Sequence, residues 1–306
     1  MSPFDVTDAL SLAARHGLHL SADDVTVNEA GLDYRVVLAS DDTGRRWVLR
    51  IPRRSDVSAK TADELRILDL VGPVLAEDGI AVPRWEIHEP DLIAYRALPG
   101  APGLTLNDAG EPVWHMDPAD PRYARRLGRL LARLHSIDAE RTDAAGVEVR
   151  SPDRTRRAWR DDITRVHDAF TAAPALAGAW AEWLDDDSCW PDHTVMTHGE
   201  IYPAHVLLDE DGAVTGVLDW TTARVDDPAR DFVIQYGAAG EEMLRVTLAA
   251  YVDAGGRVHD GLAAQVEHLW NAAPVGYALF ALITEKESDL ATAAAMLDPQ
   301  DRPCSR

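Results

Sequence analysis

The 306-residue chain lacks the features that define several protein classes. Its two cysteines, Cys189 and Cys304, are too few for a disulfide framework, which favours reduced thiols and a cytoplasmic protein. No apolar run approaches the roughly 20 residues that a membrane span needs. Residues 1–10 also lack the basic and apolar regions of a signal peptide. We therefore expect no membrane segment and no secretion signal.

Basic residues are also scarce. The chain has 30 Lys and Arg against 52 Asp and Glu, which gives a net charge of −22. Because a protein that binds a polyanion needs a basic face, this balance argues against nucleic acid as a partner. The acidic surface is compatible with a cationic small substrate, and equally with a surface that serves solubility alone.

The sequence does have the composition of a large folded protein. Hydrophobic residues make up 46% of it and nine are Trp, so a disordered chain is excluded. A chain of this length buries an ample core in two lobes or one large domain. We find no internal repeat and no low-complexity tract. Nothing in the sequence indicates an oligomer, and we expect a monomer.

Hydrophobic periodicity predicts a strand-rich first third and a helical remainder. An initial helix at 5–16 is followed by strands at 25–27, 35–39, 47–51, 85–88 and 92–97, with a long helix at 58–76 and a small hairpin at 105–114. Later helices are expected at 123–135, 154–184 (one or two helices), 241–254, 261–272 and 275–297. This order is typical of an α+β protein. The Pro- and Gly-rich passage 95–100 predicts a boundary between residues 1–97 and residues 98–306.

The stretch 197–220, THGEIYPAHVLLDEDGAVTGVLDW, carries the clearest chemical signal. Two short strands, 206–208 and 214–218, flank a DEDG turn and predict a hairpin. Glu200 and His205 precede this hairpin and Asp219 follows it, so the hairpin can bring the three together. A carboxylate on a loop can take a hydroxyl proton, and a polar residue with an aspartate can hold Mg²⁺. Phosphoryl transfer requires these parts, because it consists mostly of positioning and charge neutralisation.

This segment resembles the signature of the aminoglycoside-phosphotransferase-like kinases, HGDxxxxN followed by a strand that ends in an I-D-W/F sequence. A His at the usual Asn position is similar to the macrolide 2′-phosphotransferase branch of that family. Four further segments agree in order: WVLRIPRR at 47–54, LLARLHSID at 130–138, DDPARDF at 226–232 and YALFAL at 277–282. The resemblance implies a bilobal protein-kinase-like fold, with a small β-rich N-terminal lobe and a larger helical C-terminal lobe.

The resemblance also assigns roles on the loop. It implies that Glu200 is the catalytic base and that His205 and Asp219 hold Mg²⁺. Since Glu is one methylene longer than the usual Asp, the loop must lie further from the acceptor. His198 is expected to be a fold histidine that bonds the loop backbone, and Asp231 to brace the loop from below.

The same resemblance assigns residues to the nucleotide, expected to be GTP, with ATP as an alternative. The turn at Gly31 would cover the phosphates, although a plain hairpin turn explains it equally well. Arg50 would grip phosphate oxygens and Glu64 would orient it, against the alternatives of a surface arginine and a solvated helix face. Arg96 and Leu98 would meet the nucleotide base through their main chain.

The acceptor implied by the resemblance is a macrolide, phosphorylated on the 2′-hydroxyl of its amino sugar. A large apolar ring with a dimethylamino group favours a hydrophobic wall beside carboxylates. The candidate residues for this acceptor site are Tyr202, Trp270, Tyr277, Phe280 and Thr284. As helix core, the four C-terminal members would need no ligand.

Three other functions compete with this one. The first is a kinase for another acceptor, such as an aminoglycoside, whose several ammonium groups would need a more acidic pocket. The second is a non-catalytic kinase-like binder, because Glu200, His205 and Arg50 all depart from the commonest kinase pattern. The third is an iron site of two His and one carboxylate, from His198, Glu200 and a distant His259 or His268. The helical second half argues against the third, since such sites usually lie in β-barrels.

Overall fold

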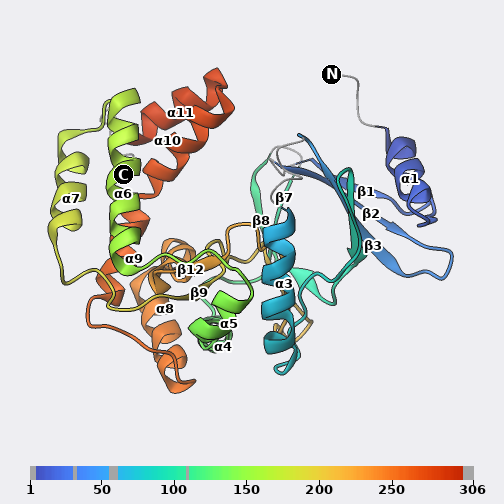
Figure 1. Cartoon of the computed structure of the whole chain (residues 1–306), viewed down its shortest axis with the longest axis horizontal. Coiled ribbons are helices and arrows are strands. Elements are labelled where there is room, and N and C mark those ends of the chain that lie inside the picture. The colour runs from blue at the N-terminus through green and yellow to red at the C-terminus, as the bar shows by residue number, and fades with distance from the viewer. Residues whose placement is uncertain (1–4, 30–32, 55–60, 108–109, 299–306) are drawn as a thin grey trace.

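The computed structural model describes residues 5–29, 33–54, 61–107 and 110–298 (Figure 1). The fold is bilobal and kinase-like, with a β-sheet in the N-terminal part and mostly helices in the C-terminal part. The N-terminal elements are α1 (Val6–Arg15), β1 (Thr26–Asn28), β2 (Tyr34–Ser40), β3 (Arg46–Pro52), α3 (Thr61–Ala76), β4 (Trp85–Glu89) and β5 (Leu92–Arg96). The expected α+β class is therefore confirmed. The expected boundary at 97/98 falls between β5 and the next strand and stays a prediction.

The N-terminal sheet has two unlike faces. Its strands run antiparallel in the order β1-β2-β3-β5-β4. Because side chains alternate along a strand, Val37 and Leu49 point to one face and are covered by Leu12 of α1. On the other face Tyr34 and Tyr95 are buried beside the guanidinium of Arg50. The alternation of side chains along β3 thus places Arg50 on the face of the sheet opposite α1, called the inner face below.

Helix α3 connects this sheet to the rest of the protein. Its apolar residues, among them Leu68 and Val71, are buried in the large core that the C-terminal helices form. Near its start, Glu64 is buried and points to the sheet side. A single helix therefore packs into one half and presents a carboxylate to the other.

The C-terminal part contains short strands and eight α-helices within the described residues. The strands are β6 (Ala101–Pro102), β7 (Leu104–Leu106), β8 (Pro112–Trp114), β9 (Val195–Thr197), β10 (Val206–Leu208), β11 (Val214–Val217) and β12 (Arg224–Asp226). The helices are α4 (Pro121–His135), α5 (Ala139–Ala144), α6 (Pro152–Ala169), α7 (Pro174–Asp185), η1 (Pro228–Asp231), α8 (Val233–Asp253), α9 (Leu262–Asn271), α10 (Ala273–Thr284) and α11 (Glu287–Leu297). In the described part of the chain, none of the helices has both the length and the hydrophobicity to cross a bilayer.

Helices α4 and α8 form the centre of this part. Leu127 and Leu131 of α4 are fully buried, and Tyr251 of α8 packs with them. Gly128 permits the close approach, because a Cβ there would lie 2.3 Å from the carbonyl oxygen of Thr247. The helix expected at 123–135 is therefore confirmed as a packing element.

The limits of one expected helix are wrong. The sequence predicts a single helix at 275–297, but α10 ends at Thr284, and Glu285 adopts a left-handed φ of 54° before α11 begins. By contrast, α8 is interrupted at Gly240, a non-helical residue with φ 76°, so the helix expected at 241–254 is confirmed as its second part. The region 154–184 forms two helices, because Pro174 starts the second one.

The hairpin expected at 206–218 forms as β10 and β11, and it contacts the N-terminal lobe at Ala81. β10 pairs with β11 on one side and with β6 on the other, in the order β11-β10-β6. Ala81, which follows α3, exchanges backbone hydrogen bonds with Thr215 and Val217 of β11, both of 2.9 Å. The hydroxyl of Thr215 also donates to the carbonyl of Pro99 (2.7 Å).

Candidate active site

The loop 198–205 between β9 and β10 is held from below by one carboxylate. β9 pairs with β12, which leads into η1 and places Asp231 under the loop. Asp231 Oδ2 accepts the backbone N–H of His198 (2.9 Å), and Oδ1 accepts that of Gly199 (2.6 Å). Its carboxyl is fully buried, and although burial raises its pKa, bonds to His135 and to these N–H groups bring the net pKa below the usual range. A charged, buried acceptor thus fixes the start of the loop.

Gly199 occupies a position that only glycine tolerates. Its φ is +87°, and a Cβ there would lie 2.4 Å from the guanidinium of Arg230 and 2.9 Å from the carbonyl oxygen of Thr222. Arg230 donates to the hydroxyl of Thr197 (3.1 Å) and is ion-paired with Asp226 (3.4 Å). The loop therefore packs directly on a partly buried guanidinium.

His198 links the loop to the far end of the hairpin. Its Nε2 donates to the carbonyl of Leu218 (2.9 Å), and its Nδ1 accepts the backbone N–H of Glu200 (3.3 Å). This pattern defines a neutral imidazole with the proton on Nε2. Burial lowers the pKa of His198 to about 4, which keeps the ring neutral.

His205 and Asp219 face each other at the end of the loop. The Nδ1–H of His205 donates to the carbonyl of Glu200 (2.9 Å), which turns its Nε2 away from the loop and towards Asp219. Asp219 Oδ2 lies 3.7 Å from that Nε2. Burial raises the pKa of Asp219, but His205, the Thr221 hydroxyl (2.6 Å) and Arg50 lower it below its usual range. The pair forms an electron-rich mouth suited to a cation.

Glu200 stands beside this pair with its side chain at the surface. Although one side of Glu200 faces solvent, the surrounding protein partly desolvates its carboxyl and raises the pKa of that group. The negative charge of Asp219 raises this pKa further. His205 and Arg230 lower that pKa and do not fully offset the rise. Glu200, His205 and Asp219 are thus close enough for their charges to interact.

Arg50 and Glu64 form a buried, two-pronged ion pair on the inner face of the sheet. The guanidinium donates to both Glu64 oxygens, at 2.6 and 3.1 Å, and is 4.1 Å from the centre of the Tyr34 ring. Burial lowers the pKa of Arg50, but the Glu64 carboxylate more than offsets this and the net pKa is raised. The backbone N–H of Trp220 also bonds Glu64, which ties the pair to the residue after Asp219.

The other residues expected to bind the nucleotide are Arg96, Leu98 and Gly31. The side chain of Arg96 is exposed, pairs with Glu86 (2.7 Å) and lies near the Trp47 ring, on the α1 face of the sheet. Only its main chain is therefore available for a role in base recognition. Leu98 follows β5 with a half-buried side chain. Gly31 lies outside the described residues.

The residues expected at the acceptor do not form one cluster. Tyr202 lies on the loop, with its ring 4.5 Å from the His205 ring. Trp270 packs on Gly237 of α8, Tyr277 and Phe280 have ring centres 5.7 Å apart on α10, and the Thr284 hydroxyl donates to Asp289 (2.8 Å). The structure thus joins Tyr202 to the loop and gives the others packing partners among the C-terminal helices.

A family model described as a phosphotransferase enzyme family matches residues 24–264, most of the chain. The chain belongs to this phosphotransferase family. The structure of macrolide 2′-phosphotransferase MphH from Brachybacterium faecium is 48% identical, with a TM-score of 0.89 over 98% of this chain and all of that one. A macrolide 2′-phosphotransferase type I is 39% identical, with a TM-score of 0.89 over 98% of this chain and 99% of that one.

A third relative is protein YcbJ of Bacillus subtilis (strain 168), which is 38% identical over 288 residues, 93% of each chain. The two phosphotransferase structures belong to the branch that the segment 197–220 predicts, so that resemblance is confirmed. The protein is therefore a phosphotransferase with an alcohol group as acceptor.

The donor set of this phosphotransferase fits a hard cation that arrives with phosphates. Within the described residues, no group of three or more His, Cys, Asp or Glu side chains is arranged to hold a metal on its own. Mg²⁺ prefers oxygen ligands, so it usually takes one or two carboxylates and completes its shell with phosphates and water. Asp219 supplies one carboxylate, and the Nε2 of His205, an unusual ligand for Mg²⁺, lies 3.7 Å from it. The same finding excludes the iron alternative for His259 and His268, and the latter stacks on Trp183.

Sequence reasoning missed several residues that position the phosphotransferase loop. The segment DDPARDF contains Arg230, but its sequence does not predict that this side chain fills the space beneath Gly199. From the sequence, His135 at the end of the helix expected at 123–135 is best interpreted as a cap for the last carbonyls of that helix, and the structure shows this interpretation to be wrong. His135 bridges Asp231 (3.1 Å) and the hydroxyl of Tyr251 (2.9 Å). Partners 96 and 116 residues away leave no local signal.

Proposed function

We propose that the protein transfers the γ-phosphate of a nucleoside triphosphate, GTP by preference, to the 2′-hydroxyl of the amino sugar of a macrolide. The observation that carries this proposal is the loop geometry: Glu200 beside the His205–Asp219 pair, on a loop fixed by Asp231. The 48% identity to a macrolide 2′-phosphotransferase over the whole chain supports the choice of acceptor. We further propose that it acts as a monomer in the cytoplasm, where the nucleotide is made.

In the proposed step, the sugar hydroxyl oxygen forms a bond to the γ-phosphorus. The bond from that phosphorus to the β–γ bridging oxygen breaks, and the nucleoside diphosphate leaves with the electron pair. Glu200 accepts the hydroxyl proton, and its raised pKa improves its ability to do so. The fixed backbone of His198 and Gly199 holds that carboxyl in place, which matters because small displacements cost rate.

His205 and Asp219 would hold Mg²⁺, which when bound neutralises charge on the phosphate oxygens. The Nδ1–H bond of His205 to the Glu200 carbonyl orients the imidazole so that its free nitrogen faces Asp219. Arg50 would direct the donor phosphates, and Glu64 limits how far the guanidinium can turn. The main chain of Arg96 and Leu98 would contact the nucleotide base.

The acceptor would lie beside Tyr202, with the aromatic residues of α9 and α10 as a wall. Trp270 is 41% exposed and Ile283 is 74% exposed, so these helices present apolar surface to a large ring. The protonated amine of the sugar would be attracted by the acidic chain, whose net charge is −22.

A donor-by-acceptor panel tests this proposal. Purified protein is assayed with GTP or ATP against macrolides, aminoglycosides and no acceptor, and the product is located by mass spectrometry and NMR. We expect turnover with a macrolide, faster with GTP, and a phosphate on the 2′-oxygen. Glu200→Gln should lower kcat about 10²- to 10⁴-fold, the usual contribution of a general base, with nucleotide KM nearly unchanged.

The matched control is Glu242→Gln, which removes an exposed carboxylate on α8 far from the loop in sequence and should leave kcat unchanged. Turnover only with an aminoglycoside would overturn the acceptor assignment. Nucleotide binding without transfer to any acceptor would favour a kinase-like binder. Full activity of Glu200→Gln would remove Glu200 from the role of base.

A further inference from the structure

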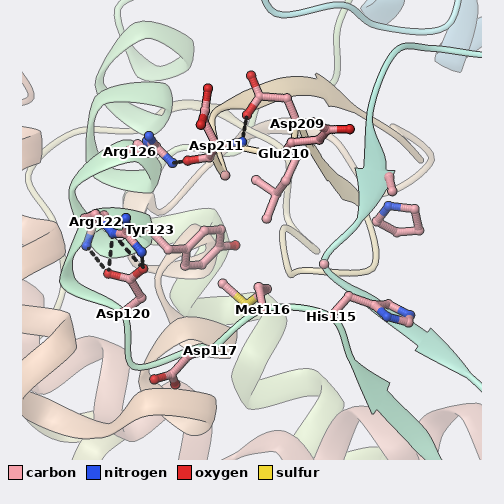
Figure 2. A pocket seen from close by; sticks show the side chains of 15 residues that line it. His115, Met116, Asp117, Asp120, Arg122, Tyr123, Arg126, Asp209, Glu210 and Asp211 are labelled. Carbon is pink, nitrogen blue, oxygen red and sulfur yellow. Dashed lines mark hydrogen bonds and ion pairs between the residues drawn. The ribbon is translucent and has the colours of Figure 1, made fainter.

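A cavity lies at the turn of the β10–β11 hairpin, at the opposite end from His205 and Asp219. Its volume is about 470 Å³, within the range of small-molecule sites. β6, the segment 115–117, the first two turns of α4 and the turn 209–212 enclose it (Figure 2). It shares no residue with the proposed active site.

A tyrosine at the floor of this cavity has an unpartnered hydroxyl. Tyr123 is 4% exposed, and its hydroxyl has no hydrogen-bond partner within the described part of the chain. Figure 2 shows the ring directed in among the lining side chains, with Met116 below it and the hairpin turn above it. A buried polar atom without a partner destabilises a fold, so an occupant of the cavity that bonds this hydroxyl would remove that cost.

The charges of the side chains that line the cavity indicate the sign of the charge on that occupant. Five carboxylates line the cavity against two arginines: Asp117, Asp120, Asp209, Glu210 and Asp211 against Arg122 and Arg126. Arg122 pairs with Asp120 (2.9 Å), and Arg126 donates to the carbonyl of Asp211 (2.9 Å). Asp209 accepts two backbone N–H groups of its own turn, and the carboxylates other than Asp120 belong to exposed residues at the rim. The lining therefore carries a net negative charge, which disfavours an anion.

The spacing of these carboxylates selects the kind of cation. In the part of the chain that the structure describes, no three acidic or histidine side chains converge as a metal site. The floor is instead aromatic and apolar, with Tyr123, Met116 and Leu208. An ammonium group carried on an organic body suits such a surface, because an aromatic ring and carboxylates both attract it. The Met116 side chain is flexible enough to move aside for it.

We propose that this cavity is a binding site for a small organic ammonium ion, with its amine near the carboxylates of the turn and a hydrogen bond to the hydroxyl of Tyr123. This site is separate from the acceptor site and does not depend on the proposed transfer reaction.

Equilibrium dialysis of the full chain tests this proposal with two labelled probes, spermidine and choline, in about 0.15 M salt to suppress weak surface attraction. We expect one equivalent of at least one probe to bind saturably. Tyr123→Phe should weaken that binding about tenfold, and the double variant Glu210→Gln, Asp211→Asn should weaken it at least as much. The double variant Glu242→Gln, Asp253→Asn removes the same charge from exposed positions on α8 and should change nothing.

Unfolding in urea without amine controls for folding of Tyr123→Phe. The variant should be as stable as the wild type or more stable, because the change removes an unpaired buried hydroxyl. Equal weakening in both double variants, with no effect of Tyr123→Phe, would assign the binding to the general acidic surface and overturn the site. Absence of saturable binding of either probe would overturn it too.

Discussion

At the scale of single residues, Arg50 and Glu64 separate what stabilises the fold from what serves the reaction. Glu64→Gln should destabilise the protein by about 3 kcal/mol, because it leaves a buried guanidinium without its counter-charge. Replacing both residues, as Arg50→Met with Glu64→Leu, should be nearly neutral for stability, since an apolar pair avoids desolvation. Both variants should raise the nucleotide KM.

Unfolding in urea and steady-state kinetics measure the two effects. A double variant that keeps wild-type nucleotide KM would show that Arg50 has no contact with the donor, and its role would then be structural alone.

His198 makes stability depend on pH. Burial lowers its pKa from 6.5 to about 4. Below pH 6.5 the imidazole of His198 is protonated in the unfolded chain but stays neutral in the folded chain. The contribution of His198 to the free energy of unfolding is therefore present above pH 6.5 and is lost as pH falls towards 4. We expect the advantage of the wild type over His198→Gln to shrink by about 3 kcal/mol between pH 7 and pH 4. Comparing the two proteins at each pH cancels the other titrating groups.

The measurement is the free energy of urea unfolding at half-unit pH steps. A difference that stays constant across this range would mean that His198 is solvated or charged in the folded state.

The residues of the loop could be predicted because their spacing is local. Glu200, His205 and Asp219 lie around one hairpin, and a hairpin returns the chain to where it began. The partners of His135 and the packing of Arg230 under Gly199 depend on contacts far apart in the sequence. Such contacts follow from the folded helices alone, and no periodicity encodes them.

At the scale of elements, the break between α10 and α11 is under mild strain. Glu285 has φ 54° at the end of α10, and a side chain in that region costs about 1 kcal/mol compared with glycine. Glu285→Gly should therefore raise the free energy of unfolding by up to about 1 kcal/mol. Thermal and urea unfolding would detect the change, and Glu287→Gly, in the first turn of α11, should destabilise instead. Destabilisation by Glu285→Gly would mean that its side chain has a contact that outweighs the strain.

This break also shows why the sequence misplaced some elements. Residues 275–283 and 290–297 are both apolar at helical spacing, and the polar residues between them, 284–289, include no Gly or Pro that would mark a stop. The stop comes from a residue type that does not usually adopt a left-handed conformation, and propensity therefore gives no warning. The start of α7 is left open in the expected region 154–184, although Pro174 at its first turn is a local signal for it.

At the scale of the whole molecule, the net charge of −22 should separate the two substrates by their response to salt. A protonated amino sugar is attracted to the protein and a nucleotide is repelled, and salt screens both interactions. Raising the ionic strength from about 0.02 to 0.3 M should lower kcat/KM for the acceptor several-fold, with kcat nearly constant. At fixed free Mg²⁺, kcat/KM for the nucleotide should stay level or rise. Parallel losses for both substrates would contradict this explanation.

The two lobes are joined by more than the single passage at 97–100. Ala81 exchanges backbone hydrogen bonds with Thr215 and Val217 of β11, and α3 packs its apolar side chains into the core of the C-terminal helices. A rigid swing about that passage would have to break both of these contacts. Opening for nucleotide exchange should therefore come from bending of the outer strands β1 and β2, while the middle of the molecule moves as one block. Amide hydrogen exchange should then be slowest at residues 81 and 217, and fastest along the edge strand.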